Sequence, residues 1–186
     1  AVLCSDAPSL VIAGAGSGKT RVLTYKIAYL LKQGMQPWNI LALTFTNKAA
    51  REMRERIATL VSSEKASSLW MGTFHSIFAR ILRTEGHRLG YDTNYTIYDT
   101  DDSRRLMKEC MKSLNIDEKT LGHKVILNEI SRAKDSLRGP AQYEAEAGAD
   151  FRLKTVARCY TMYQRRLLEA DAMDFDDLLC KVIDLF

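Results

Sequence analysis

The sequence comprises 186 residues, of which 46% are hydrophobic, and carries a formal net charge of +4. This composition allows a sizeable core and excludes collagenous, low-complexity and intrinsically disordered classes. No apolar run approaches the length of a membrane-spanning helix and no signal-peptide pattern is present, so neither a membrane protein nor a secreted one is expected. Because the chain starts without methionine and ends within an apolar pattern, we expect a segment of a longer protein.

Charge and cysteine placement narrow the class of protein further. Residues 19–56 carry eight Lys or Arg and two Glu, whereas residues 169–186 carry six acidic residues and one Lys. A basic band suits a polyanionic partner, although a basic helix is commonly a solvated face. Four dispersed cysteines and only three histidines argue against a zinc site. We therefore predict a reducing, cytoplasmic environment in which the cysteines are small core residues.

The first half of the chain alternates between strand and helix patterns. Three short apolar runs, at residues 9–13, 39–45 and 69–74, predict buried parallel strands. A helical period of apolar residues follows each run, as in residues 47–60, and the polar stretch 62–68 predicts a surface connection. This alternation predicts an α/β fold with a parallel sheet flanked by crossover helices.

Helical periods dominate after about residue 88, apart from a short strand signal at 95–98. Two apolar stripes predict amphipathic helices; they comprise Ile126, Ile130, Ala133 and Leu137, and then Leu153, Val156, Ala157, Tyr160 and Leu167. Residues 138–150, punctuated by Gly and Pro, predict the link between these helices. A mainly helical subdomain attached to the sheet domain is expected.

Residues 13–20 read AGAGSGKT, a glycine-rich turn between the first predicted strand and its helix. Such a turn lets backbone N–H groups converge on phosphate oxygens at a helix N-terminus. Lys19 would reach the β- and γ-phosphates of a nucleoside triphosphate, and the Thr20 hydroxyl would coordinate Mg²⁺. The strict pattern GxxxxGK[ST] begins with glycine where this chain has Ala13, and the alternative is a chance glycine-rich turn. The predicted nucleotide-binding residues are Ala13, Gly14, Ala15, Gly16, Ser17, Gly18, Lys19 and Thr20.

Three ordered segments, AGAGSGKTRVL, ILALTFTNKAAREMRER and GTFHSIFARILR, resemble the UvrD/Rep-type superfamily 1 DNA helicases. The later IYDTDD, SRAKDSL and MDFDDLL extend the resemblance over nearly the whole chain. It implies a RecA-like P-loop NTPase fold with a helical insertion. The implied divisions are residues 1–88 for the first part of the ATP-binding domain, 89–172 for the insertion and 173–186 for a return segment.

The activity implied by this resemblance is 3′-to-5′ translocation on single-stranded DNA with duplex unwinding, driven by ATP and Mg²⁺. It implies a cytoplasmic protein acting in DNA repair or replication. The implied partners are single-stranded DNA, duplex junctions and the remaining helicase domains, with no membrane.

The TFTNK segment falls where the second predicted strand meets its helix, at the sheet edge where open α/β sheets bind ligands. Thr44, Thr46 and Asn47 can donate hydrogen bonds to DNA phosphates. Lys48 adds positive charge, and Phe45 offers a stacking face for an unpaired base. The resemblance assigns this motif to single-stranded DNA. The alternative is that Asn47 caps the helix and Phe45 lies in the core.

The GTFHS segment occupies the same edge of the third predicted strand and offers Thr73, His75 and Ser76. By the resemblance these residues also lie along the DNA path, although His75 can equally be a structural histidine. Arg21 resembles the family arginine that packs against the adenine; a solvated helix arginine is the alternative.

Acidic clusters near residues 99 and 174 are interpreted as helix caps. The magnesium ligand of a P-loop ATPase normally ends a buried apolar strand, and no such strand is expected before Asp174. Capping is therefore predicted there, and Asp99 or Asp101 is predicted to cap another helix. The family's DExxQ segment, its glutamine-bearing adenine-reading segment and its second RecA-like domain do not occur in these residues. The chain alone is therefore expected to be inactive.

Two rival functions remain open from the sequence. A P-loop small-molecule kinase would explain the glycine-rich turn but not the basic, threonine-rich TFTNK. A non-catalytic DNA-binding module would require that the glycine-rich turn no longer binds a nucleotide. The intact Gly-Lys-Thr argues against this.

Overall fold

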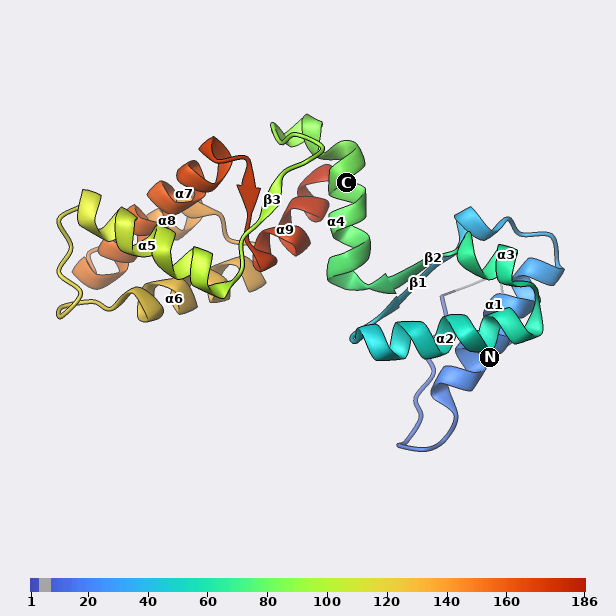
Figure 1. The fold of residues 1–186 in the computed structure, drawn as a ribbon. Coiled ribbons are helices and arrows are strands. Elements are labelled where there is room, and N and C mark those ends of the chain that lie inside the picture. Colours follow the sequence, from blue (N-terminus) through green and yellow to red (C-terminus); the bar gives the residue numbers. More distant parts are fainter. Residues whose placement is uncertain (4–7) are drawn as a thin grey trace. The chain divides into compact units, whose positions relative to one another are not determined.

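The computed structural model describes residues 1–3 and 8–186 (Figure 1). The chain divides into two compact units, which we call unit 1 (residues 1–77) and unit 2 (residues 78–186). The boundary falls within helix α4 (Phe74–Glu85). The divisions expected at residues 88 and 172 stay predictions.

Unit 1 is built on two parallel strands, β1 (Leu41–Thr44) and β2 (Trp70–Thr73). They pair in register from Leu41 opposite Trp70 to Thr44 opposite Thr73, so their carboxyl ends meet at one edge. The helical elements before α4 are α1 (Lys19–Lys32), the 3₁₀ turn η1 (Pro37–Asn39), α2 (Asn47–Leu60) and α3 (Ser63–Ser67). Helix α2 packs against both strands and against α1. The second and third predicted strands and the helix at 47–60 are thus confirmed.

The core of unit 1 comes from the apolar faces of α1, α2 and the strands. Its buried members are Ile27, Leu31, Ile40, Ala42, Met53, Ile57, Ala66, Leu69 and Met71. The predicted surface connection at residues 62–68 is exposed except for Ala66, but it contains the helix α3, which the sequence did not predict. The Ser62 side chain accepts a hydrogen bond from the Lys65 N–H and starts this short helix, and Ala66 then buries against the core.

The apolar run at residues 9–13 does not form the predicted buried strand. Residues 8–14 carry no regular secondary structure, and Leu10 and Ile12 are 88% and 91% exposed. A strand forms where ladder hydrogen bonds and burial outweigh the entropy lost on ordering the chain. Strands β1 and β2 pair with each other and not with this run. The run therefore gains neither ladder hydrogen bonds nor burial.

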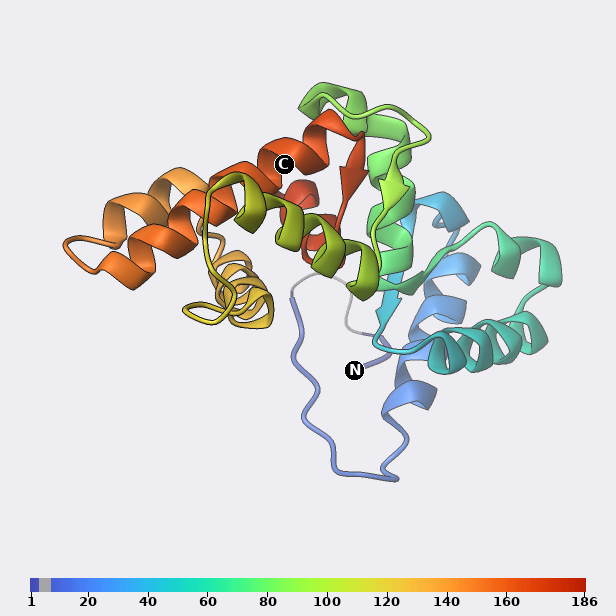
Figure 2. The same cartoon turned by 60° about the vertical axis from the view of Figure 1, so that its left-hand side comes forward.

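Unit 2 is mainly helical (Figure 2). Its elements after α4 are the 3₁₀ turn η2 (Gly86–Leu89), β3 (Thr96–Ile97), α5 (Thr100–Ser113), α6 (His123–Asp135), α7 (Pro140–Glu146), α8 (Phe151–Glu169), β4 (Ala172–Met173) and α9 (Phe175–Leu185). Strands β3 and β4 pair in parallel, Thr96 opposite Ala172 and Ile97 opposite Met173. They join the start of the helical region to its end.

Two apolar clusters hold unit 2 together. The larger one packs α5, α6, α7 and α8 and includes Cys110 and Cys159, which confirms the core role predicted for these two cysteines. The smaller one joins α4, β4 and α9 through Leu82, Met173 and Leu178. Cys180 is half-buried, and Cys4 lies outside the described residues.

Two details of the predicted helical region were wrong. Residues 138–150 contain helix α7, because Gly139 and Pro140 start a helix as readily as they end one, and its Tyr143 is buried. Leu137 leaves the apolar stripe of α6, since the helix ends at Asp135 and Leu137 has a positive φ of 55° and is 56% exposed.

Both predicted aspartate caps are confirmed. The Asp99 carboxylate accepts hydrogen bonds from the Asp101 and Asp102 N–H groups at the start of α5. The Asp174 carboxylate accepts one from the Asp177 N–H at the start of α9. The expectation that no buried strand precedes Asp174 was wrong, because β4, two residues long and buried, ends directly before it.

Candidate functional site

The glycine-rich turn uses glycine where the backbone requires it. Gly16 and Gly18 have φ values of 74° and 85°, in the left-handed region that residues with a side chain rarely adopt. Ser17 closes the turn, because its N–H and its hydroxyl both donate to the Gly14 carbonyl, at 3.4 and 2.6 Å. The turn thus delivers the chain directly to the first residue of α1.

The N-terminus of α1 is suited to an anion. Gly18 occupies the capping position and supplies no side-chain hydrogen bond to the helix, and no acidic residue lies in the first turn. The first N–H groups of a helix have no partner within the helix, and here they lie at the positive end of the helix dipole, beside the exposed Thr20. This arrangement favours a phosphate group.

The side chain of Lys19 folds back over the turn. Its ammonium donates to the Ala13 carbonyl at 3.1 Å and to the Gly14 carbonyl at 2.7 Å. These contacts bring together three of the predicted nucleotide-binding residues, Ala13, Gly14 and Lys19. They place one fixed positive charge at the turn.

A pocket of about 470 Å³ adjoins the turn. It is lined by Val2, Gly16, Ser17, Gly18, Arg21, Val22 and Tyr25. The Arg21 guanidinium lies over the Tyr25 ring, 5.7 Å from its centroid, which places a cation and an aromatic face in one wall. The pocket thus contains three predicted turn residues and Arg21.

The described residues meet the needs of Mg²⁺ only in part. Thr20 supplies one exposed hydroxyl, but Mg²⁺ in a nucleotide site is held by a carboxylate as well. Among the described residues that line this pocket, none is a carboxylate.

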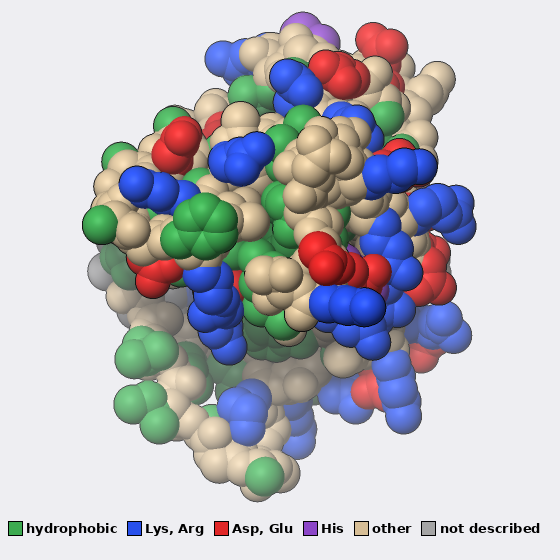
Figure 3. All heavy atoms as spheres, turned by 90° about the vertical axis from the view of Figure 1, so that its left-hand side faces the viewer, with side chains coloured by type: hydrophobic (Ala, Val, Ile, Leu, Met, Phe, Trp, Pro, Cys, Tyr) green, Lys and Arg blue, Asp and Glu red, His purple; other side chains and the backbone are tan. Residues whose placement is uncertain are grey.

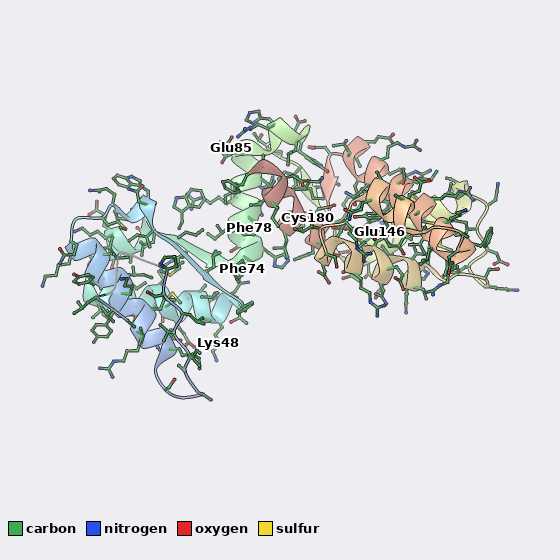
Figure 4. The ribbon with its side chains drawn as sticks, turned by 180° about the vertical axis from the view of Figure 1, so that it is seen from behind. Lys48, Phe74, Phe78, Glu85, Glu146 and Cys180 are labelled. Atoms are coloured by element: carbon green, nitrogen blue, oxygen red, sulfur yellow. The ribbon has the colours of Figure 1, made fainter. Side chains whose placement is uncertain are left out.

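The carboxyl ends of β1 and β2 form a second candidate site, which we call the strand-end edge (residues 44–48 and 73–76). Thr44 and Thr73 are register partners, and each is followed by a phenylalanine, Phe45 or Phe74. Figure 4 shows Phe74 at the start of α4 and Lys48 at the start of α2. The carboxyl ends of the two strands, each followed by a phenylalanine, therefore lie side by side, as predicted from the TFTNK and GTFHS motifs.

Threonine hydroxyls start both helices at this edge. Thr46 accepts a hydrogen bond from the Ala49 N–H at 3.2 Å, and Thr73 accepts one from the Ser76 N–H at 3.2 Å. The alternative in which Asn47 caps α2 is therefore wrong, because Thr46 occupies that position. Thr44 is buried, and its hydroxyl donates to the Thr46 carbonyl at 3.1 Å.

Phe45 projects from the edge. Its side chain is 92% exposed, so the alternative that placed it in the core is wrong. Its ring centroid lies 5.6 Å from that of Phe74, with the ring planes tilted by 40°. The sequence analysis omitted Phe74, although the shared Thr-Phe of TFTNK and GTFHS marks the two positions as equivalent.

The other predicted members of the edge differ in exposure. Asn47, Lys48 and Ser76 are exposed, whereas Thr73 and His75 are half-buried. Positive charge, hydroxyl groups and an aromatic ring are thus available together on one surface of unit 1. Their assignment to DNA stays a prediction.

Gly72 in β2 permits the close approach of this edge to α4. A Cβ at this position would lie 2.5 Å from the Ser76 Oγ and 3.2 Å from the Ile77 Cγ1. We expect Gly72→Ala to destabilise the chain by about 1–3 kcal/mol, because the Ser76 and Ile77 side chains at the start of α4 must shift. Urea unfolding checks this, with Gly139→Ala, at a glycine with nothing within 4 Å, as the matched control. Equal stability of the two variants would contradict the steric argument.

The described helices include none long and apolar enough to cross a membrane. On the face of unit 2 seen in Figure 3, basic and acidic side chains are intermixed. This pattern is typical of a solvated surface.

Fold and turn together define a mixed α/β protein with a glycine-rich turn at a helix N-terminus. The chain belongs to the UvrD/REP helicase family, since the family's N-terminal domain matches residues 1–186. It is 49% identical to the ATP-dependent DNA helicase PcrA of Leuconostoc citreum. The corresponding identities are 47% for PcrA of Staphylococcus aureus and 48% for PcrA of Staphylococcus epidermidis. Each match covers 100% of this chain and 25% of the relative, so the chain spans about a quarter of their length.

Proposed function

We propose that this chain is the N-terminal, ATP-binding and single-stranded-DNA-binding part of an ATP-dependent DNA helicase. The observation that carries this proposal is the pairing, within unit 1, of a glycine-rich turn at an uncapped helix N-terminus with the strand-end edge bearing exposed Phe45. Family membership and the helicase relatives support it.

In this proposal unit 1 is part of a RecA-like P-loop fold. Backbone N–H groups of the turn and α1 hold the phosphates, Lys19 neutralises charge on the transferred group, and Arg21 packs against the base. Mg²⁺ would supply charge neutralisation when bound, and Thr20 is the residue of this chain that would hold it. A carboxylate from the remainder of the parent protein completes that site.

The strand-end edge holds single-stranded DNA. Exposed Asn47, Lys48 and Ser76 contact phosphates, and Phe45 stacks on a base. Thr46, Thr73 and His75 belong to the same assignment. Thr44, predicted with them, is buried and its hydroxyl donates to the Thr46 carbonyl, so it supports the edge from within and does not contact a phosphate. The parent moves 3′-to-5′ and unwinds duplex DNA at junctions, in cytoplasmic repair or replication. The isolated chain lacks the catalytic acids and the second RecA-like domain, so it is inactive alone.

Two variants of the full-length parent test the DNA assignment. Lys48→Ala should lower the dependence of single-stranded DNA affinity on salt by roughly one phosphate contact, about 0.7 in the logarithmic slope. Phe45→Ala should lower affinity by about 1–3 kcal/mol with that slope unchanged, because stacking releases no counterions. Fluorescence anisotropy titrations at several salt concentrations measure both effects.

Lys65→Ala is the matched control, since Lys65 is an exposed lysine of unit 1 outside the strand-end edge. Unchanged DNA binding in both edge variants would remove the proposal. A small-molecule kinase would then be favoured, and DNA-independent phosphoryl transfer would be sought. DNA binding without DNA-stimulated ATP turnover in the parent would instead favour a non-catalytic binding module.

A further inference from the structure

The two phenylalanines of the strand-end edge differ in how firmly they are held. Phe45 is 92% exposed and lies in the short connection between β1 and α2. Phe74 is half-buried and is the first residue of α4. The ring contact at 5.6 Å joins an exposed aromatic side chain to an anchored one.

Phe74 is anchored by the bonds on both sides of it. Thr73 accepts the Ser76 N–H, and the Ser76 hydroxyl donates to the Thr73 carbonyl at 2.9 Å. Just before these residues, Gly72 allows Ser76 and Ile77 to close onto β2, and the Arg54 guanidinium donates to the Met71 carbonyl at 2.7 Å. The backbone that carries Phe74 is therefore fixed by α2, β2 and α4 together.

An exposed ring without a neighbour samples several rotamers, and binding a base must then select one of them. A tilted ring pair at this distance has favourable edge-to-face or offset geometry. The contact with Phe74 therefore limits the orientations that Phe45 adopts before a base arrives. Such preorganisation raises affinity without any contact between Phe74 and the ligand.

We infer that Phe74 is a positioning residue for base stacking, acting through the Phe45 ring. The inference rests on the proposed single-stranded DNA function and names the residue that makes the edge selective for a base over bare phosphates. Phosphate contacts from Lys48 do not depend on Phe74.

Substitutions of the full-length parent test this role. Phe74→Leu keeps an apolar side chain but removes the ring, and we expect about threefold weaker binding of an oligothymidylate. Phe45→Leu should weaken binding about tenfold, and the double variant should bind no more weakly than Phe45→Leu alone. Phe74→Tyr keeps the ring and should bind as the unchanged protein does.

An oligonucleotide of the same length with abasic sites in place of its bases separates positioning from a structural role. It retains the phosphates, so Phe74→Leu should leave its affinity unchanged. A threefold loss on the abasic strand, or a loss from Phe74→Leu that persists in the Phe45→Leu background, would overturn the inference. Normal binding by Phe74→Leu beside weakened binding by Phe45→Leu would also overturn it while leaving the proposed function intact. Normal binding by both variants would remove the proposed DNA edge itself.

Discussion

Lys19→Ala in the full-length parent is expected to abolish steady-state ATP turnover and DNA unwinding while the protein stays folded. The Lys19 ammonium lies at the glycine-rich turn, held by the Ala13 and Gly14 carbonyls. Phosphoryl transfer depends on fixed positive charge against the developing negative charge of the transferred group. Removing that charge should lower turnover by 10²-fold or more, on the order of 3 kcal/mol in the barrier.

Lys32→Ala is the matched control, because Lys32 is an exposed lysine at the other end of the same helix. A coupled assay of ADP release in the presence of single-stranded DNA measures turnover, and circular dichroism verifies that both variants fold. The side chain of Lys19 is exposed, and within the described part of the chain its ammonium bonds to the turn carbonyls alone, so its loss should leave stability unchanged. ATP turnover in folded Lys19→Ala at the rate of the Lys32→Ala control would refute the nucleotide assignment.

Periodicity predicted the elements whose apolar residues recur along one face or form a short buried run. Helices α1 and α2 follow apolar stripes that pack in the core of unit 1, and β1 and β2 follow short apolar runs. The first residue of α2 was harder to predict, because Thr46 and Asn47 are adjacent and both are suitable caps. Only the backbone geometry at residue 46, which is extended, decides between them.

Non-local terms explain the remaining differences. The run at residues 9–13 has the composition of a buried strand, but a strand also needs a partner for its backbone, and composition does not specify one. Phe45 has an apolar side chain of the kind usually found in a core. It lies beyond the last paired residue of β1, however, and is exposed. The contact between Phe45 and Phe74 depends on the register of two strands far apart in sequence, which no local pattern encodes.

A buried ionic cluster in unit 2 is the clearest case of a feature that the sequence analysis missed. Lys134 of α6 is 4% exposed, and its ammonium lies 2.7 Å from the Asp174 Oδ2 and 2.9 Å from the Asp177 Oδ1. Tyr163 donates to Asp174 at 3.1 Å, and Gln164 donates to Asp177 at 3.0 Å. Helices α6, α8 and α9 therefore meet at one charged centre, in addition to the predicted cap.

The protonation of this cluster follows from burial and mutual attraction. Burial opposes the charge of Lys134, but the two carboxylates outweigh it and raise its pKa above the ordinary value. Burial also opposes the charge of Asp174, yet the Lys134 ammonium and the hydrogen bonds lower the pKa of that carboxyl. At Asp177 burial and the neighbouring Asp174 prevail over Lys134, so the pKa of Asp177 is raised.

The α6 lysine also bonds through its backbone. Cys180 of α9, labelled in Figure 4, donates its thiol to the Lys134 carbonyl at 3.4 Å. That bond does not involve the ammonium, so a side-chain substitution at residue 134 leaves it in place. The effect of such a substitution therefore reports the charge cluster.

Lys134→Met is expected to destabilise the chain by about 3–5 kcal/mol at pH 7, because it leaves two buried carboxylates facing each other without their cation. In the variant, burial and mutual repulsion raise both carboxyl pKa values above the unfolded value of about 3.9. A group whose folded pKa is raised favours the folded state only when protonated, so the penalty is full above the folded pKa and shrinks as the pH falls. In the unchanged protein the pKa of Asp174 is lowered, so its effect on stability has the opposite pH dependence. The ionised Asp174 stabilises the fold above the unfolded pKa, and this stabilisation is lost on acidification. The stability difference between the two proteins should therefore narrow between pH 7 and about pH 5.

Urea unfolding followed by circular dichroism at both pH values measures this difference, with Lys124→Met, at an exposed position of the same helix, as the matched control. Lys134→Met combined with Asp174→Asn and Asp177→Asn removes all three charges and keeps amide groups that can cap α9. This triple variant should recover most of the lost stability, because the cost arises from unpaired buried charge and not from lost volume. A Lys134→Met protein as stable as Lys124→Met, or a loss that is the same at both pH values and in the triple variant, would show that the cluster contributes only packing.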